Sequence, residues 1–328
     1  MMEIKVCPST LSEGFSTYSP VAVKHFLGGK KVSPVLPYAS FPSESNQAEF
    51  DSNRCRFSLS GAQSKYSVLI DGDHFRLTEE GEQGTYILKP RLSDFENRAA
   101  SPANEHLTMQ IASQVYGISI APCGICFSEQ GETAYLVKRY DVLQDGSKIQ
   151  QEDFASLGGI SAETFGRNFK YDAFNYEELG LLIRQHLPAW PVEMVKFLDL
   201  VIFNFLFANG DAHAKNFSVL MTPDGDYRLA PAYDLINTLI HLPDDTIFAL
   251  RKGLYNGWYD HYITGSDFLI LAARLGIPDR VAKQELERFR ADYPLVDRLI
   301  SRSFLPEPLK ERYRDIYMAR LKSFLRAS

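Results

Sequence analysis

The sequence predicts an α+β protein with a strand-rich first lobe and a helical second lobe, and the boundary falls near Asp141. Short runs rich in β-branched and aromatic residues gather before this point. The segments after it are longer and have helical periodicity. A chain of 328 residues is also long enough for two lobes with a sizeable core.

In the first lobe we expect strands over residues 65–70, 85–89 and 134–140. Turn-forming residues around and between the first two strands support this, namely Asp71-Gly72-Asp73 and Glu82-Gln83-Gly84.

One helix is expected in the first lobe, over residues 103–115, because Pro102 stands near its start and Gly117 just past its end. The helices of the second lobe are expected over residues 176–187, 192–208, 265–275, 279–291 and 308–325. Residues 1–54 are rich in Ser and Pro and predict an irregular extension that lies on the fold.

Composition limits the possible functions. The net charge is 35 − 41 = −6, which argues against direct binding to nucleic acid or to an anionic membrane. Four cysteines are too few for a disulfide framework at this length, so a reducing cytoplasm is expected. Cys123-Gly124-Ile125-Cys126 matches half of a zinc site, but no second pair at zinc spacing follows, so we interpret these cysteines as structural or incidental.

No membrane segment is predicted. The N-terminal residues lack the basic and apolar regions of a cleaved signal peptide. The most apolar stretch, residues 192–208, contains Glu193, Lys196 and Asp199 and predicts a buried helix. We expect a cytoplasmic protein, and a non-cleaved signal for secretion into a host stays an open alternative.

The clearest chemical signal is a pair of carboxylates with an asparagine between them. Asp211 stands five positions before Asn216, and Asp234 follows in Ala232-Tyr233-Asp234. Protein kinases use this spacing, in which the first Asp accepts the proton of the attacked hydroxyl and the Asn and second Asp bind Mg²⁺. His213 and Lys215 lie between them and suit a site that handles phosphate. Taken alone, a polar turn explains the motif equally well.

Upstream residues occur in the order that a phosphotransfer site needs. A small-residue loop over residues 56–65 would let backbone amides approach phosphate, although an ordinary turn has the same composition. Lys89 ends a strand and Glu105 begins the next helix, which are the places of a phosphate-binding lysine and its ion-pair partner. In isolation both would be surface residues, so Lys89→Ala is expected to weaken ATP use more than stability.

These motifs resemble those of the HipA-type serine/threonine kinase toxins of bacterial toxin–antitoxin systems. The resemblance rests on residues 58–65 (SLSGAQSK), 209–216 (NGDAHAKN) and 231–234 (PAYD) and extends from about Ser58 to the C-terminus. The family implies a bilobal protein-kinase-like fold. Residues 1–57 would be the extension on the N-lobe, residues 58–140 the N-lobe with its phosphate loop, and residues 141–328 the C-lobe with its catalytic loop.

The resemblance also implies a role for each matched position. Asp211 would be the catalytic base, Asn216 and Asp234 would bind Mg²⁺, and Ser58 or Ser60 would be autophosphorylated. Lys138, Arg139 and Tyr140 would form the hinge beside adenine, where Lys138 stands at a position that is acidic in some relatives, so recognition there should rest on backbone groups. The full set implied to bind ATP is Ser60, Gly61, Ala62, Gln63, Ser64, Lys65, Lys89, Lys138, Arg139, Tyr140, His213, Lys215, Asn216 and Asp234.

Cofactors and partners follow from the same resemblance. They are ATP, Mg²⁺ and a protein substrate, with glutamyl- or tryptophanyl-tRNA synthetase as the expected target. Only 57 residues precede Ser58, and this short form is similar to HipT, whose systems include a small HipS-like protein and a DNA-binding HipB-like antitoxin. DNA would be contacted only through that partner.

Three alternatives stay open on the residues alone. The first is a phosphotransferase of the same fold that acts on a lipid or small molecule, because no acceptor site can be identified in the sequence. The second is a catalytically silent scaffold, although Lys89, Asp211, Asn216 and Asp234 are all present. The third is a DNA-binding regulator, against which the net charge of −6 argues.

Overall fold

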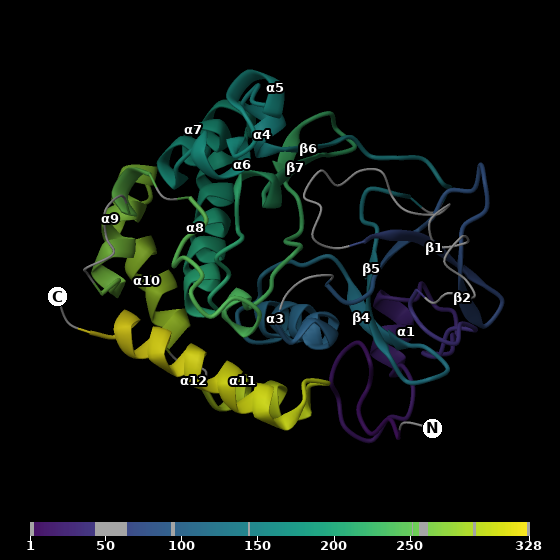
Figure 1. Cartoon of the computed structure of the whole chain (residues 1–328). Helices are drawn as coiled ribbons and strands as arrows, with labels where there is room; N and C mark the ends of the chain where they lie inside the picture. Colours follow the sequence, from purple (N-terminus) through teal and green to yellow (C-terminus); the bar gives the residue numbers. More distant parts are fainter. Residues whose placement is uncertain are drawn as a thin grey trace.

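The computed structural model describes residues 3–42, 64–92, 96–143, 145–250, 252–255, 262–290 and 293–326. It has the expected two parts, with the first lobe and its sheet at one end and the helices at the other (Figure 1). Among the described residues, no helix combines the length and apolar character needed to cross a membrane.

An antiparallel sheet of five strands forms the first lobe, in the order β2-β1-β3-β5-β4. Its strands are β1 (Tyr66–Asp71), β2 (His74–Leu77), β3 (Tyr86–Lys89), β4 (Cys123–Phe127) and β5 (Thr133–Lys138). The three predicted strands correspond to β1, β3 and β5. The predicted turn at Asp71-Gly72-Asp73 joins β1 to β2, and Gly72 adopts the left-handed φ of 59° that this tight connection needs.

Strand β4 was not predicted, and its burial explains why. All five of its residues are buried, so the sequence Cys-Gly-Ile-Cys-Phe lacks the alternation of a half-exposed strand. The strand places Cys123 in the main core and Cys126 in a second cluster on the opposite face. The two thiols therefore face apart and cannot share one metal ion, and the described residues contain no group of three or more His, Cys, Asp or Glu side chains placed to hold one.

The N-terminal segment is an integral part of this lobe. Residues up to and including Phe41 supply half of the buried side chains in the second cluster, among them Tyr18, Phe26 and Leu36. The segment contains one short helix, α1 (Pro20–His25), and otherwise runs beside β4 without regular structure (Figure 1). Its backbone bonds to β4, for example from the Ile125 amide to the Pro8 carbonyl at 2.7 Å, so the outer edge of the sheet is covered.

Helix α3 (Ser101–Gln114) lies between the sheet and the helical lobe (Figure 1). Its residues from Ser101 to Ala112 are buried on all sides, because it contacts β4 and β5 on one side and α11 on the other. Polar side chains on this helix therefore need partners inside the protein. Asn104 illustrates this, since its amide donates to the Asn237 carbonyl at 2.8 Å and its oxygen accepts from the Asn237 amide at 3.2 Å.

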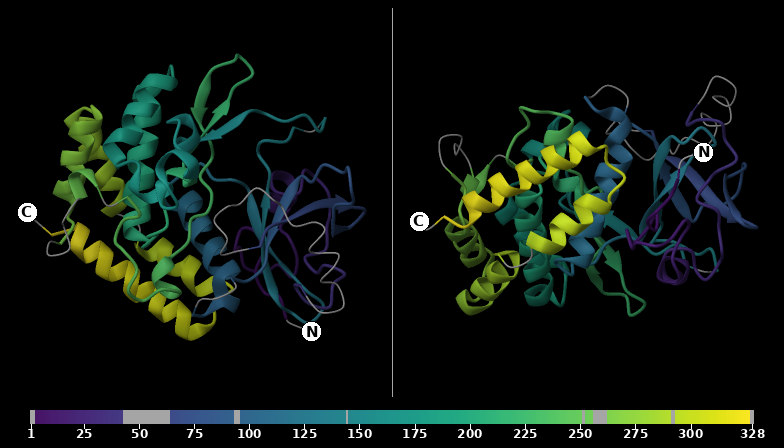
Figure 2. Two further views of the ribbon diagram at one scale, coloured as in Figure 1. Left: turned by 45° about the horizontal axis from the view of Figure 1, so that its top comes forward. Right: turned by 90° about the horizontal axis from the view of Figure 1, so that it is seen from below.

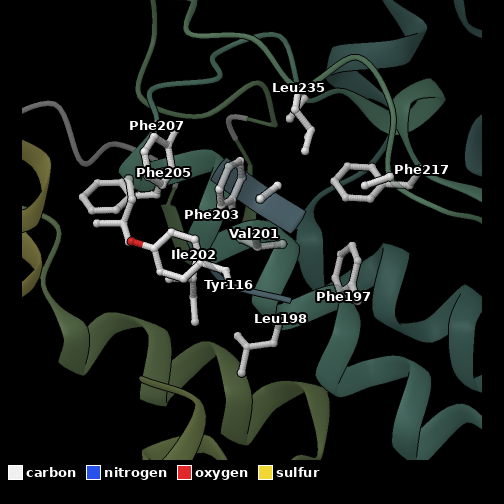
Figure 3. Close-up of a cluster of buried hydrophobic side chains, with 14 of the residues drawn as sticks. Tyr116, Phe197, Leu198, Val201, Ile202, Phe203, Phe205, Phe207, Phe217 and Leu235 are labelled. Atoms are coloured by element: carbon white, nitrogen blue, oxygen red, sulfur yellow. The ribbon is translucent and has the colours of Figure 1, made fainter. Parts of the chain in front are cut away.

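The second lobe is built around α8 (Trp190–Leu206), whose aromatic and aliphatic residues fill the core. Figure 3 shows Phe197, Val201 and Phe203 of this helix close to Tyr116 and Phe217. Phe203 stacks on Phe207 at 4.5 Å between ring centroids. As predicted, this apolar stretch is a buried helix, and its few polar residues are bonded: Asp199 to Arg288 at 3.0 Å and Glu193 to the Leu229 amide at 3.0 Å.

The other helices surround α8. The major ones are α7 (Tyr176–His186), α9 (Gly265–Leu275), α10 (Asp279–Arg290), α11 (Tyr293–Arg302) and α12 (Glu307–Phe324). Four of them match the predicted ranges within two residues, and α11 was not predicted. Helices α11 and α12 run along one side of the molecule, as the view from below shows (Figure 2).

A small antiparallel sheet and three short helices complete the lobe beside α7 and α8 (Figure 1). The strands are β6 (Gln151–Asp153), β7 (Ser218–Met221) and β8 (Tyr227–Leu229), and the helices are α4 (Phe154–Leu157), α5 (Ala162–Phe165) and α6 (Phe169–Asp172). The remaining elements are single 3₁₀ turns: η1 (Arg98–Ala100), η2 (Ala214–Asn216), η3 (Thr238–Ile240) and η4 (Gly253–Tyr255). Strand β7 follows directly after the Asp211–Asn216 motif and anchors its end.

Candidate active site

Two loops of the second lobe meet at the candidate site. One follows α8 and contains Asp211 and Asn216, and the other follows β8 and contains Asp234. The Asn209 side chain donates to the Asp234 carbonyl at 3.4 Å and thereby links the loops. Gly210 permits a close approach, because a Cβ at this position would lie 2.3 Å from the Asp245 carboxylate and 2.6 Å from the Thr246 carbonyl.

The backbone is strained on both loops. Ala208 and Asp234 have φ values of 51° and 55°, in the left-handed region that residues other than glycine seldom adopt. Surrounding hydrogen bonds hold this geometry, since the Ala208 carbonyl accepts from both the amide and the hydroxyl of Thr238, at 2.9 and 3.0 Å. Strain of this kind concentrates where a side chain must point in a particular direction. Here it fixes where the Asp234 carboxylate points.

A four-member charge cluster connects the two lobes. Lys89 at the end of β3 bonds Glu105 of α3 at 2.6 Å and also bonds Asp234. Lys65, immediately before β1, lies 3.5 Å from the second oxygen of Asp234. Burial alone would raise the pKa of Asp234, but Lys65 and Lys89 outweigh it and hold that pKa well below its usual range. Asp234 is therefore a carboxylate at any physiological pH.

Lys89 and Glu105 form the ion pair that their order in the sequence predicts, and their burial rules out the alternative in which both are surface residues. Each side chain is only 4% exposed. The helix also begins at Ser101, two residues earlier than expected, so Glu105 lies past the first turn and faces the sheet. Sequence could not indicate this, because the burial comes from packing on both sides of α3.

The premise that Lys89 buries little area is therefore wrong, and its removal should affect stability as well as ATP use. We expect Lys89→Ala to lower the free energy of unfolding by roughly 3–5 kcal/mol, because it leaves Glu105 and Asp234 without their shared cation. Thermal and urea unfolding without nucleotide measure this. Lys283→Ala is a matched control, since Lys283 forms an exposed ion pair with Asp279 and should change stability by less than about 0.5 kcal/mol. Equal effects of the two substitutions would contradict the prediction.

Asp211 lies at the mouth of the site with half of its side chain exposed. Its Oδ1 accepts a hydrogen bond from the Tyr171 hydroxyl and lies 4.0 Å from His213 Nε2. Partial burial raises the pKa of Asp211, although the bond from Tyr171 and the charge of Lys170 oppose this shift. Burial lowers the pKa of His213 to about 3, so the imidazole is neutral and does not form an ion pair with Asp211.

Asn216 has the chemistry of a metal ligand. Its Oδ1 is buried and has no hydrogen-bond partner among the described residues. An orphaned buried acceptor costs free energy unless a ligand satisfies it. Together with the ionised Asp234 it provides the hard oxygen donors that Mg²⁺ prefers. The residues present therefore fit a magnesium ion.

A cavity of about 780 Å³ opens between the lobes at this point. It is large enough for a nucleotide. Among the predicted ATP-binding residues, those that line it are Lys65, Arg139, His213, Lys215, Asn216 and Asp234. Asp211 also lines it. Lys89 does not line it, because its buried ammonium group bonds the carboxylates of Glu105 and Asp234.

The three predicted hinge residues lie only partly at the cavity. Only Arg139 of the three hinge residues lines the cavity, and its guanidinium is held by Asp141, with Nε 3.0 Å from the carboxylate. The amides of Lys138 and Arg139 donate to the carbonyls of Pro122 and Thr85 at 2.8 and 2.9 Å. These two amides are therefore used inside the fold, and a base would have to be recognised by other groups.

A sequence model of the HipA-like C-terminal domain matches residues 57–295, which is more than half of the chain. The chain belongs to the HipA-like family. The match begins just before the serine-containing loop and ends within α11, so it includes the sheet, both site loops and the cavity.

Relatives of this HipA-like chain carry kinase names. It is 27% identical to a protein of Haemophilus influenzae named "Putative kinase", over 92% of this chain and 90% of that one. It is 36% identical to a Sinorhizobium fredii protein of the same description and 24% identical to the serine/threonine-protein kinase toxin HipA of Shewanella oneidensis. In these two comparisons the match spans 46% and 56% of the relative, so the relatives contain further sequence.

Solved structures confirm the kinase-like fold of this HipA-like chain. It superposes on HipA of Shewanella oneidensis, in a complex with HipB and operator DNA, with a TM-score of 0.66 at 23% identity, over 82% of this chain and 65% of that one. It superposes on the Helicobacter pylori proinflammatory kinase CtkA with a TM-score of 0.51 at 15% identity, over 80% and 90% of the two chains.

Part of the predicted site lies outside the described residues. This applies to Ser58, Ser60, Gly61, Ala62 and Gln63 of the expected phosphate loop, whereas Ser64 and Lys65 lie immediately before β1. Of the last two, only Lys65 lines the cavity.

A segment near Asp211 was not predicted as part of the site. Arg167, Phe169 and Lys170 line the cavity, and Tyr171 bonds Asp211. The run Arg167-Asn168-Phe169-Lys170-Tyr171 alternates basic and aromatic residues, and this was the only available signal. It is a weak one, because such runs are common on protein surfaces.

Proposed function

We propose that this HipA-like chain is a serine/threonine protein kinase that acts as the toxin of a bacterial toxin–antitoxin system. One observation carries the proposal: a half-exposed Asp211 that binds a hydroxyl group lies in the same cavity as the orphaned Asn216 oxygen and the ionised Asp234. These are the groups that phosphoryl transfer from ATP to a hydroxyl requires.

Each residue would have a separate task. Asp211 would orient the attacking hydroxyl and accept its proton as the oxygen–phosphorus bond forms and the bond to ADP breaks. Asn216 and Asp234 would hold Mg²⁺, which neutralises charge on the phosphates when bound. Lys89, fixed by Glu105, and Lys65 would exchange part of their contact with Asp234 for phosphate oxygens. His213, being neutral, would add no charge to the site.

Transfer of radiolabel tests this assignment. Purified protein, Mg²⁺ and γ-labelled ATP should label a small number of proteins in a bacterial lysate, and labelling should depend on Asp211. Mass spectrometry should locate the phosphate on serine or threonine. If the label is found only in lipids or small molecules, the alternative phosphotransferase is correct. Mg-ATP binding without transfer to any acceptor would indicate a silent scaffold.

The finer functional assignment is also a proposal and rests on the family. The target would be a serine of an aminoacyl-tRNA synthetase, either tryptophanyl or glutamyl. Partners would be a DNA-binding HipB-like antitoxin and a small HipS-like protein, as expected for the short HipT form, in the bacterial cytoplasm. One similar solved chain, HipA of Shewanella oneidensis, is in a complex with HipB and operator DNA, which supports such a partnership. Co-purification with each candidate partner tests it.

Self-control by autophosphorylation is a separate prediction. We expect wild-type protein incubated with Mg-ATP to gain one phosphate on Ser58 or Ser60, and a second only in a minor species, because two adjacent phosphates repel each other. The added charge of about −2 in a phosphate-binding loop should then reduce transfer. Intact-protein mass spectrometry checks this, with the double alanine variant as control. The same added phosphate on that variant would show that neither serine is the site.

A further inference from the structure

The Tyr171 hydroxyl is hydrogen-bonded to the carboxylate oxygen of Asp211 that an acceptor hydroxyl would use. It donates to Asp211 Oδ1, and the two residues lie 40 positions apart in the sequence. This is the geometry that a general base forms with the hydroxyl it deprotonates. Tyr171 therefore holds an internal hydroxyl on the base before any substrate arrives.

Several contacts aim Tyr171 at this position. Its ring meets the His213 imidazole edge to face, with centroids 5.0 Å apart. The Lys170 ammonium lies 4.8 Å from the centre of the same ring. Phe169, two residues earlier, is buried in the main core and anchors the single turn of α6. The hydroxyl is thus positioned from a fixed element.

We propose that Tyr171 is a specificity-determining residue that an acceptor hydroxyl must displace from Asp211. The inference deepens the proposed kinase function and rests on it. A protein acceptor that makes further contacts with the surface can offset the lost hydrogen bond. Water cannot, because it brings no other contacts. Tyr171 would therefore suppress wasteful hydrolysis of ATP while leaving transfer to a docked protein possible.

The suppressed reaction is simple. In hydrolysis, water would attack the γ-phosphorus, its proton would pass to Asp211, and the bond between the γ-phosphorus and the bridging oxygen would break to release ADP and phosphate. Removing only the Tyr171 hydroxyl frees Asp211 Oδ1 for this water. Hydrogen bonds to charged groups are strong enough for their loss to change a rate about tenfold.

Steady-state ADP release with Mg-ATP and no protein acceptor tests the inference, because water is then the acceptor probe. Tyr171→Phe should raise this rate about tenfold and change the KM for ATP by less than twofold. The increase in rate should disappear when Tyr171→Phe is combined with Asp211→Asn. Tyr171→Ala should show the same direction. Tyr227→Phe removes a phenol hydroxyl in β8 and should leave the rate unchanged. Measuring after the first turnovers separates hydrolysis from autophosphorylation.

The pH dependence of the hydrolysis rate distinguishes this role from a purely structural one. Burial raises the pKa of Asp211, and the bond from Tyr171 opposes that rise. Without this bond, the acidic limb of the hydrolysis rate should move to higher pH. An unchanged rate in Tyr171→Phe, or phosphate found on Tyr171 itself, would overturn the inference. If Mg-ATP does not bind at all, as judged by thermal shift of the wild type, the proposed kinase function has failed instead.

Discussion

Asp211→Asn should lower phosphoryl transfer by a factor of about 10²–10⁴ and leave the fold and Mg-ATP binding intact. Asparagine has the shape of aspartate and still accepts the hydrogen bond from Tyr171, but it cannot take up a proton at neutral pH. The side chain is half exposed, so little packing is lost. Initial rates with labelled ATP measure the effect, and thermal shift with Mg-ATP measures binding.

A control for this substitution is Asp224→Asn, in the exposed turn between β7 and β8, which should behave as wild type. Full transfer by Asp211→Asn would mean that Asp211 is not the base. The pH dependence offers a second check. Because burial raises the pKa of Asp211, the rate should fall on acidification at a higher pH than for a free aspartate of pKa 3.8, and the loss should follow protonation of the base.

Asp234→Asn should abolish the thermal stabilisation by Mg-ATP as well as transfer. Asparagine tolerates the left-handed φ of 55° at this position, so the loop should keep its path. The substitution removes the only charge from the two proposed Mg²⁺ ligands, because Asn216 is neutral. It also takes from Lys65 and Lys89 the carboxylate that they share, which should destabilise the nucleotide-free protein by about 1–3 kcal/mol.

Comparison of the two variants separates their roles. Asp211→Asn should keep the Mg-ATP thermal shift, whereas Asp234→Asn should lose it. Calorimetric titration of Mg-ATP into both proteins measures this difference directly. If Asp234→Asn binds Mg-ATP as tightly as the wild type, Asp234 does not hold the metal and serves only as the partner of Lys65 and Lys89.

The sequence was informative wherever a signal is local. The helices of the second lobe were predicted because apolar residues recur with helical period over ten or more positions, as in α8. Strand β4 and helix α11 were missed. Strand β4 is buried on both faces by α3 and the N-terminal segment, so its sequence carries no alternation.

For the site, the sequence alone determined that Asp211, Asn216 and Asp234 lie near one another. Asp211 and Asn216 share one loop, and only the strand pair β7–β8 separates them from Asp234. The sequence also predicted Lys89 and Glu105 as partners. Tertiary structure decided their energetics: Lys89 bonds an aspartate 145 positions away, and packing around α3 buries the pair. It alone brought Tyr171 onto Asp211, because the two come from segments with no local signal connecting them. Spacing along the chain thus indicates which residues form the site. Their burial, their ionisation and the hydrogen bond that Asp211 accepts depend on contacts that form only when distant segments pack together.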